Sequence, residues 1–169
     1  MINFKSIQKR TLAAMALLSV AGLIGAPAYA STTATTTFSV TATVNATCTI
    51  SATNLAFGTY TGTAVSQQST VSVTCSNTTP YNVGLNAGTT TGATVTTRQM
   101  AGPSGATLSY ALYSDTAHTV NWGNTVGTDT VTGTGNGAAQ ALTVYGLITA
   151  GQYPSPGSYT DTVTATVTY

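Results

Sequence analysis

Two long stretches of this chain alternate between apolar and polar side chains, with Asp161 as the single exception. One covers residues 38–50 (FSVTATVNATCTI), and the other covers residues 159–169 (YTDTVTATVTY), where every second residue is a threonine. A period of two places neighbouring side chains on opposite faces of a β-strand, whereas an amphipathic helix needs a period of about 3.6. Between residues 31 and 169, no stretch rich in good helix formers repeats at helical spacing, so the sequence predicts an all-β fold.

Further short strands are predicted along the rest of the chain, with turns and glycine-rich loops between them. The expected strands cover residues 55–60, 70–75, 81–85, 98–100, 108–113 and 142–147, and the expected loops cover residues 92–105 around one of these strands, 114–118, 123–139 and 151–157. Many short strands separated by turn signals are typical of a β-sandwich. The run 38–50 exceeds the usual strand length of about 5–6 residues. We therefore expect an early segment to about Val44 and a first domain strand around Cys48.

The first thirty residues have the pattern of a cleavable secretory signal. Lys5, Lys9 and Arg10 precede an apolar run over residues 11–25, and Ala28-Tyr29-Ala30 supplies a small-residue cleavage site. The apolar run is shorter than the roughly 20 residues that span a membrane. We expect residues 1–30 to be removed on export, and no membrane span in the rest of the chain.

Removal of this signal leaves a nearly uncharged protein. Arg98 remains as the only cation against Asp115, Asp129 and Asp161, which gives a net charge of −2. Nucleic-acid binding requires a basic surface that neutralises phosphates, so that class of function is excluded. Soluble monomers normally stay dispersed through surface charge, and so few charges fit a protein that packs against copies of itself.

The two cysteines, Cys48 and Cys75, predict a disulfide. An even number of cysteines in an exported chain is typical of a structural bridge, and both lie on the apolar side of their alternating runs. A metal site is not expected, because His118 is the only other strong ligand for zinc. A redox role is disfavoured because the chain has no C-x-x-C pair.

The inventory of reactive side chains argues against an enzyme. The chain has one His, three acidic residues and no Glu. Ser114, Asp115 and His118 lie in a single short turn, whereas a catalytic triad joins residues held apart on a rigid frame. Residues 133–137 (GTGNG) lack the strand–helix context of a nucleotide loop and are expected to be a flexible loop. We expect no catalytic residue, no cofactor and no metal.

Asp161 and Trp122 each leave two interpretations open. Asp161 falls on the otherwise apolar side of the last alternating run, where it satisfies backbone donors or, as the less favoured alternative, takes part in recognition. Trp122 and the tyrosines pack in the core or an interface, or else line a sugar-binding surface. Burial is favoured because aromatic residues contribute much of the apolar area of a core.

Eight segments, taken in order, carry a resemblance to a known family. They are FSVTATVNATCTI (38–50), LAFGTY (55–60), VSVTCSNTTPYNVGLNAG (71–88), RQM (98–100), LSYALYSD (108–115), NWG (121–123), VYGLI (144–148) and GSYTDTVTATVTY (157–169). Together they resemble the spore coat protein U domain family, which includes the major subunits of archaic chaperone–usher pili.

The resemblance implies an incomplete immunoglobulin-like β-sandwich that lacks its last strand. In this family a periplasmic chaperone lends a strand during transit, an outer-membrane usher receives the subunit, and the N-terminal segment of the next copy then fills the groove. This is donor-strand complementation, a form of β-strand addition. The expected organisation is a signal over residues 1–30, a donor segment over residues 31–45 and a sandwich over residues 46–169. The donor side chains would be Phe38, Val40, Ala42 and Val44.

The expected function is that of a structural subunit that polymerises into an extracellular pilus for surface adhesion and biofilm formation. Its partners would be further copies of itself, the chaperone and the usher. One alternative is a secreted coat protein of the same fold. Another is a tip adhesin or lectin, although such proteins usually carry an additional binding domain for which this chain has no room.

Overall fold

The computed structural model describes residues 29–169, so the expected signal over residues 1–30 lies almost wholly outside the described residues. The chain divides into two units, Met1–Thr41 and Ala42–Tyr169. The described part of the first unit, residues 29–41, contains no helix or strand, and its side chains are exposed. All the strands of the described residues belong to the second unit.

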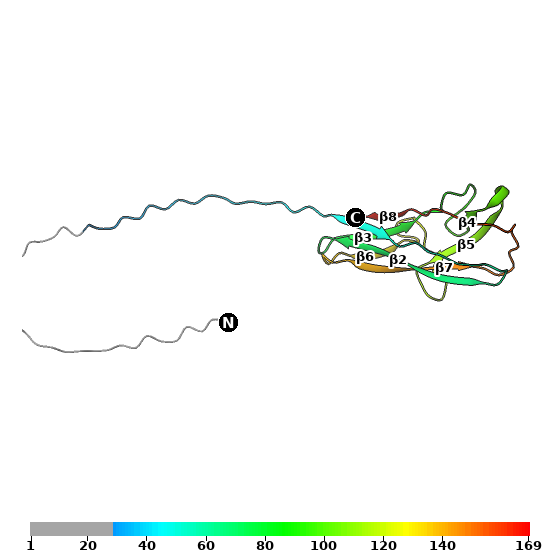
Figure 1. Cartoon of the computed structure of the whole chain (residues 1–169). Coiled ribbons are helices and arrows are strands. Elements are labelled where there is room, and N and C mark those ends of the chain that lie inside the picture. Colours follow the sequence, from blue (N-terminus) through cyan, green and yellow to red (C-terminus); the bar gives the residue numbers. More distant parts are fainter. Residues whose placement is uncertain (1–28) are drawn as a thin grey trace, which may run out of the picture. The chain divides into compact units, whose positions relative to one another are not determined.

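The second unit is built from two antiparallel sheets (Figure 1). The larger sheet has five strands in the order β1-β2-β7-β5-β4, and the smaller has three in the order β6-β3-β8. Their bounds are β1 Cys48–Ala52, β2 Val65–Cys75, β3 Pro80–Leu85, β4 Arg98–Ala101, β5 Thr107–Tyr113, β6 Val131–Thr134, β7 Gln140–Ile148 and β8 Ala165–Thr168. One 3-10 turn, Pro103–Gly105, accompanies them. The predicted all-β sandwich is confirmed.

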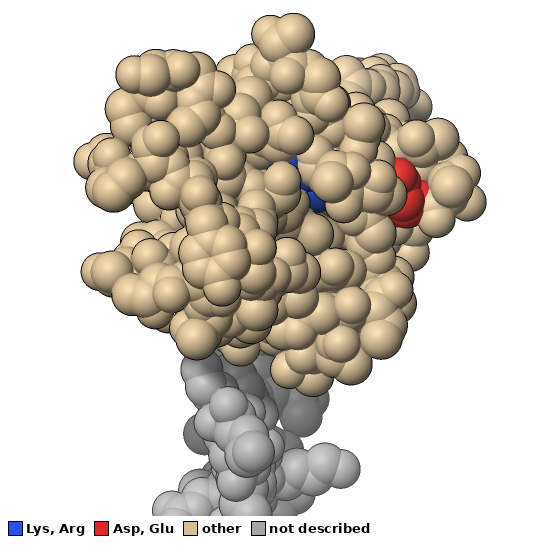
Figure 2. Space-filling view, turned by 90° about the vertical axis from the view of Figure 1, so that its right-hand side faces the viewer, with Lys and Arg blue, Asp and Glu red and all other residues tan. Residues whose placement is uncertain are grey.

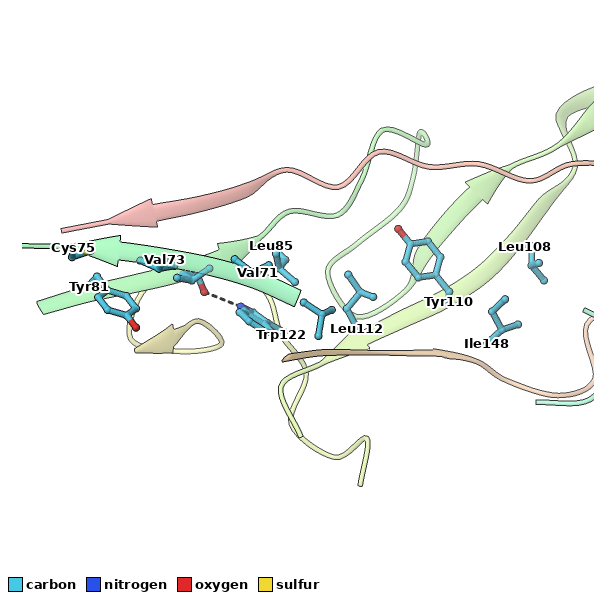
Figure 3. Packing of buried hydrophobic residues seen from close by; sticks show 12 residues of the cluster. Val71, Val73, Cys75, Tyr81, Leu85, Leu108, Tyr110, Leu112, Trp122 and Ile148 are labelled. Atoms are coloured by element: carbon cyan, nitrogen blue, oxygen red, sulfur yellow. Dashed lines mark hydrogen bonds between the residues drawn. The ribbon is translucent and has the colours of Figure 1, made fainter. Parts of the chain in front are cut away.

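The core is formed by the inward-facing side chains of strands along which buried and more exposed residues alternate. Along β2, Val71, Val73 and Cys75 are buried while the residues between them are partly exposed, as the period-two pattern predicts. Trp122 is buried with them, and its Nε1 donates a hydrogen bond of 2.8 Å to the carbonyl oxygen of Val83 (Figure 3). Trp122 is therefore a core residue, as favoured above, because its ring and its one polar atom are both satisfied inside.

Three expected elements differ from the structure. Residues 55–60, expected as a strand, form none, and the expected terminal strand over residues 159–169 is reduced to β8 with an isolated bridge between Thr160 and Ala101. Residues 131–134, expected within a loop, form β6 and pair with β3. The glycine at 133 fits there because its missing side chain leaves room for the ring of Tyr81.

Within residues 29–169, no helix has the length and apolar character needed to cross a membrane.

Candidate functional site

Two sheet edges face each other without pairing. β1 pairs only with β2, and β8 pairs only with β3, although β1 and β8 contact each other. The segments that continue from these edges are also unpaired: in the described chain, residues 54–60 and 161–163 make no backbone–backbone hydrogen bond. We call residues 54–60 the first wall and residues 159–165 the second wall.

An apolar groove lies between the two walls. One cavity of about 580 Å³ has a floor of core side chains, including Val71, Leu112 and Val144. A second cavity of about 730 Å³ adjoins it. Both cavities are lined by Leu55, Ala56, Phe57, Met100 and Tyr159. Because they share these residues, the two cavities form one elongated groove.

The first wall folds over a glycine of the large sheet. A Cβ atom on Gly146 would lie 2.8 Å from Leu55 and 2.9 Å from Phe57, which is too close for a side chain at this position of β7. The Phe57 ring also packs edge-on against Tyr110, with ring centroids 5.9 Å apart. The sequence showed Leu55 and Phe57 as alternating apolar residues, but nothing in it marked Gly146 as their contact.

Asp161 ties the second wall to two neighbouring elements. Its Oδ1 accepts hydrogen bonds from the backbone N–H groups of Thr89 and Thr162, both at 2.8 Å, and from the Thr89 hydroxyl at 3.0 Å. Its Oδ2 accepts a hydrogen bond of 2.7 Å from the Tyr110 hydroxyl. The favoured interpretation of Asp161, that it satisfies backbone donors, is confirmed.

The ionisation of this pair follows from its surroundings. Burial acts to raise the pKa of Asp161, but the hydrogen bonds from Thr89, Tyr110 and Thr162 outweigh it, and the pKa is lowered. Burial, followed by the hydrogen bond to Asp161, raises the pKa of the Tyr110 hydroxyl. The carboxylate is therefore ionised and the phenol protonated at neutral pH, which suits a charge-assisted hydrogen bond.

Arg98 is completely buried and stands opposite Tyr110 in the register of β4 and β5. Its guanidinium donates to the carbonyl oxygens of Leu85, Asn86, Val95 and Trp122 at 2.6–2.8 Å. Burial lowers the pKa of Arg98, and Tyr110, Asp161 and Asp129 oppose that effect. In Figure 2, which shows one face, blue is visible only inside a gap between uncharged side chains, and a small red area lies toward the right-hand side.

The predicted disulfide is present. Cys48 and Cys75 are bonded, and they stand directly opposite each other in the antiparallel register of β1 and β2. Their Cα atoms are 4.1 Å apart. The bond fixes the start of β1, the edge strand from which the first wall continues.

The expected donor side chains are solvent-exposed. Phe38 is 85% exposed, Val40 83% and Val44 90%, and Ala42 is also exposed. Residues 30–47 belong to no strand. Exposing a row of large apolar side chains to water is unfavourable, so another surface that covers this segment lowers the free energy.

The residues weighed for catalysis serve the loop that contains them. The Asp115 carboxylate accepts hydrogen bonds from the N–H groups of Thr119 and Val120 and from the Thr119 hydroxyl. His118 Nε2 lies 3.3 Å from the Ser66 hydroxyl oxygen, and the backbone N–H of Ser114 donates a hydrogen bond to the carbonyl oxygen of Val120. These contacts do not align Ser114, Asp115 and His118 as a triad. Among residues 29–169, no three potential ligands lie close enough to hold a metal ion.

Comparisons with known proteins agree on one family. Residues 34–166 match the Spore Coat Protein U domain. "Protein U" of Myxococcus xanthus is 44% identical over 62 residues, which cover 37% of this chain and 34% of that protein.

Among solved structures, a chain of the pre-assembly complex between the chaperone CsuC and the tip adhesion subunit CsuE, from the archaic chaperone–usher Csu pili of Acinetobacter baumannii, is similar with a TM-score of 0.55 and 27% identity. The similarity covers 75% of this chain and 40% of that one. This chain thus spans well under half the length of the relatives it matches.

Proposed function

This chain belongs to the Spore Coat Protein U domain family, and from that membership we propose that it is a structural subunit of a chaperone–usher pilus. It polymerises by donor-strand exchange: the segment 31–45 of one copy fills the groove of the sandwich, residues 46–169, in the next. The observation that carries the proposal is the open apolar groove between the two walls, whose residues 54–60 and 161–163 have no backbone partners.

The groove and the donor segment complement each other chemically. The groove presents apolar side chains and two walls with unpaired backbone groups. The donor segment offers Phe38, Val40, Ala42 and Val44 on one face and backbone donors and acceptors along its length. An added strand gains affinity from main-chain hydrogen bonds and specificity from its alternate side chains. Burial of each of the three larger side chains contributes about 1.5–3 kcal/mol.

The assembly that follows is a filament. A head-to-tail contact in which each copy gives a strand and receives another does not close on itself. During export through the periplasm, we expect a chaperone to cover the groove and an outer-membrane usher to receive the subunit. The finished pilus would lie outside the cell and serve adhesion and biofilm formation, with this chain as a shaft subunit.

A pair of substitutions on opposite faces of the donor tests this proposal. Val40→Asp places a carboxylate in an apolar groove, where burial of an unpaired charge costs about 3 kcal/mol or more. Thr41→Asp places the same charge on the outward face. Electron microscopy of cells or purified protein should show filaments for Thr41→Asp and none for Val40→Asp, while the folded sandwich accumulates in both. Normal filaments from Val40→Asp would show that this segment is not the donor.

A second candidate is a coat protein of the same fold, since the family is named for a spore coat protein. It predicts amorphous or layered assemblies in place of filaments, and the same micrographs distinguish the two.

A further inference from the structure

The second wall of the groove is held in an unusual way. Thr160 is bridged to Ala101 through both backbone groups, and the Thr164 carbonyl accepts from the N–H of Asn86. Between these two points, in the described structure, residues 161–163 have no backbone hydrogen bond to another element. The side chain of Asp161 makes the only such connection, through Thr89 and Tyr110.

The surroundings of Asp161 are shaped to receive it. Gly88 adopts a φ of +89°, and a Cβ atom there would collide with the carboxylate. The Tyr110 ring is buried in the core and lines the floor of the first cavity, so its hydroxyl reaches Asp161 from a fixed position. Asp161 thus connects a segment without ladder pairing to the loop that follows β3, through Thr89, and to β5, through Tyr110.

We propose that Asp161 is a positioning residue that holds the second wall in place before a donor strand arrives. This inference rests on the donor-strand function proposed above. An empty groove provides no ladder for residues 161–163, so the Asp161 side chain supplies their hydrogen bonds to the rest of the fold, in addition to the packing of Val163 against the core. A filled groove supplies that ladder from the donor, and the carboxylate then becomes largely redundant. Asp161 therefore governs how readily the groove accepts a strand, more than how stable the completed sandwich is.

Two forms of the chain separate these effects. The first is the full mature chain, residues 31–169, diluted from denaturant into an excess of a fluorescent peptide with the sequence of residues 35–45. The rise in fluorescence anisotropy gives the rate of strand capture. The second is a donor-fused chain, in which residues 35–44 are moved behind Tyr169 through a short Gly/Ser linker, and its thermal midpoint is measured.

Asp115→Ala is the matched control for Asp161→Ala. Both carboxylates accept hydrogen bonds from two backbone N–H groups and a threonine hydroxyl, but Asp115 lines neither cavity. Asp161→Ala should slow peptide capture about tenfold, since capture falls with the fraction of chains whose wall is in place. Asp115→Ala should leave the rate unchanged. In the donor-fused chain, the two variants should melt at similar temperatures.

Tyr110→Phe provides a milder test, because it keeps the buried ring and removes one hydrogen bond to Asp161. It should slow capture by less than Asp161→Ala does. Equal rates of peptide capture by Asp161→Ala and the unmodified chain would overturn this inference, while the proposed donor-strand function would still stand. A much lower melting temperature for donor-fused Asp161→Ala than for Asp115→Ala would also overturn it, since that outcome indicates a general structural role. An unmodified chain that captures no peptide would remove the proposed function and this inference together.

Discussion

Arg98 shows how a single side chain can organise several loops. The guanidinium donates hydrogen bonds to the carbonyl oxygens of Leu85 at the end of β3, of Val95 in the following loop, and of Trp122. Five N–H donors in a rigid fork make Arg suited to this task. Arg98, the one Lys or Arg beyond residue 10, is thus fully buried and bonded inside the protein.

Replacement of Arg98 should be strongly destabilising. Arg98→Met keeps most of the apolar stem but leaves buried carbonyl groups without donors, and each unsatisfied group costs about 1–3 kcal/mol. We expect the free energy of unfolding of the donor-fused chain to fall by about 3 kcal/mol or more in urea titrations. The free energy of unfolding of Arg98→Lys should lie between those of the unmodified chain and Arg98→Met, because one ammonium cannot reach all four oxygens. A loss below about 1 kcal/mol for Arg98→Met would contradict this account.

Sequence patterns predicted some of these residues and missed others, for a physical reason. Asp161 stood out because a charge on an apolar face needs a local explanation. Arg98 did not stand out, since its acceptors are backbone carbonyls as far away as Trp122, and backbone acceptors leave no mark in a sequence. Tyr110 is one of the tyrosines expected to pack in the core or an interface, whereas its contact with Asp161 depends on how the sheets pack.

At the level of strands, the alternation of apolar and polar residues predicted which side chains face inward better than it predicted which residues pair into strands. Tyr159, Val163 and Val167 are half-buried and the five threonines of residues 159–169 are exposed, as the period requires, yet residues 161–164 are not in a strand. The same holds for Leu55 and Phe57. A strand needs a partner edge, and both segments border the groove where that partner is missing. β6 escaped notice because its short, glycine-containing sequence has little apolar character.

Filling the groove should convert both walls into hydrogen-bonded strands. Amide hydrogen exchange measured by mass spectrometry should slow in residues 54–60 and 161–163 when the donor peptide is bound, because ladder hydrogen bonds protect N–H groups from solvent. The central strand β3 serves as the internal control and should change little. Protection confined to one wall would mean that the donor pairs with a single sheet.

The disulfide should matter most for the edge that it anchors. Loss of a native bridge from a small domain typically costs about 2–5 kcal/mol. Cys48→Ser and Cys75→Ser should both lower the urea midpoint of the donor-fused chain, and Cys75→Ser more so, because Cys75 is fully buried and Cys48 is not. Equal stability of the bridged and unbridged chains would mean that β2 holds β1 without help.

For the molecule as a whole, the open groove predicts a dependence on a supplied strand. The donor-fused chain should be a soluble monomer that melts cooperatively and forms no filaments, because a short tether gives an effective concentration of about the mM range. The body without residues 35–44 should aggregate through its exposed edges and groove. Size-exclusion chromatography of the two chains makes the comparison. A stable monomer without any donor would show that the sandwich is already complete.

The burial of Arg98 also determines how the protein meets proteases. Lys5, Lys9, Arg10 and Arg98 are the only basic residues of the chain, so trypsin-like enzymes have a single target beyond residue 10. That target lies in β4, paired with β5, and its side chain is inaccessible. Digestion after a basic residue requires an accessible, extended segment. In the folded chain, residues 29–169 therefore resist tryptic digestion, and once unfolded this part of the chain is cut once, at the bond between Arg98 and Gln99.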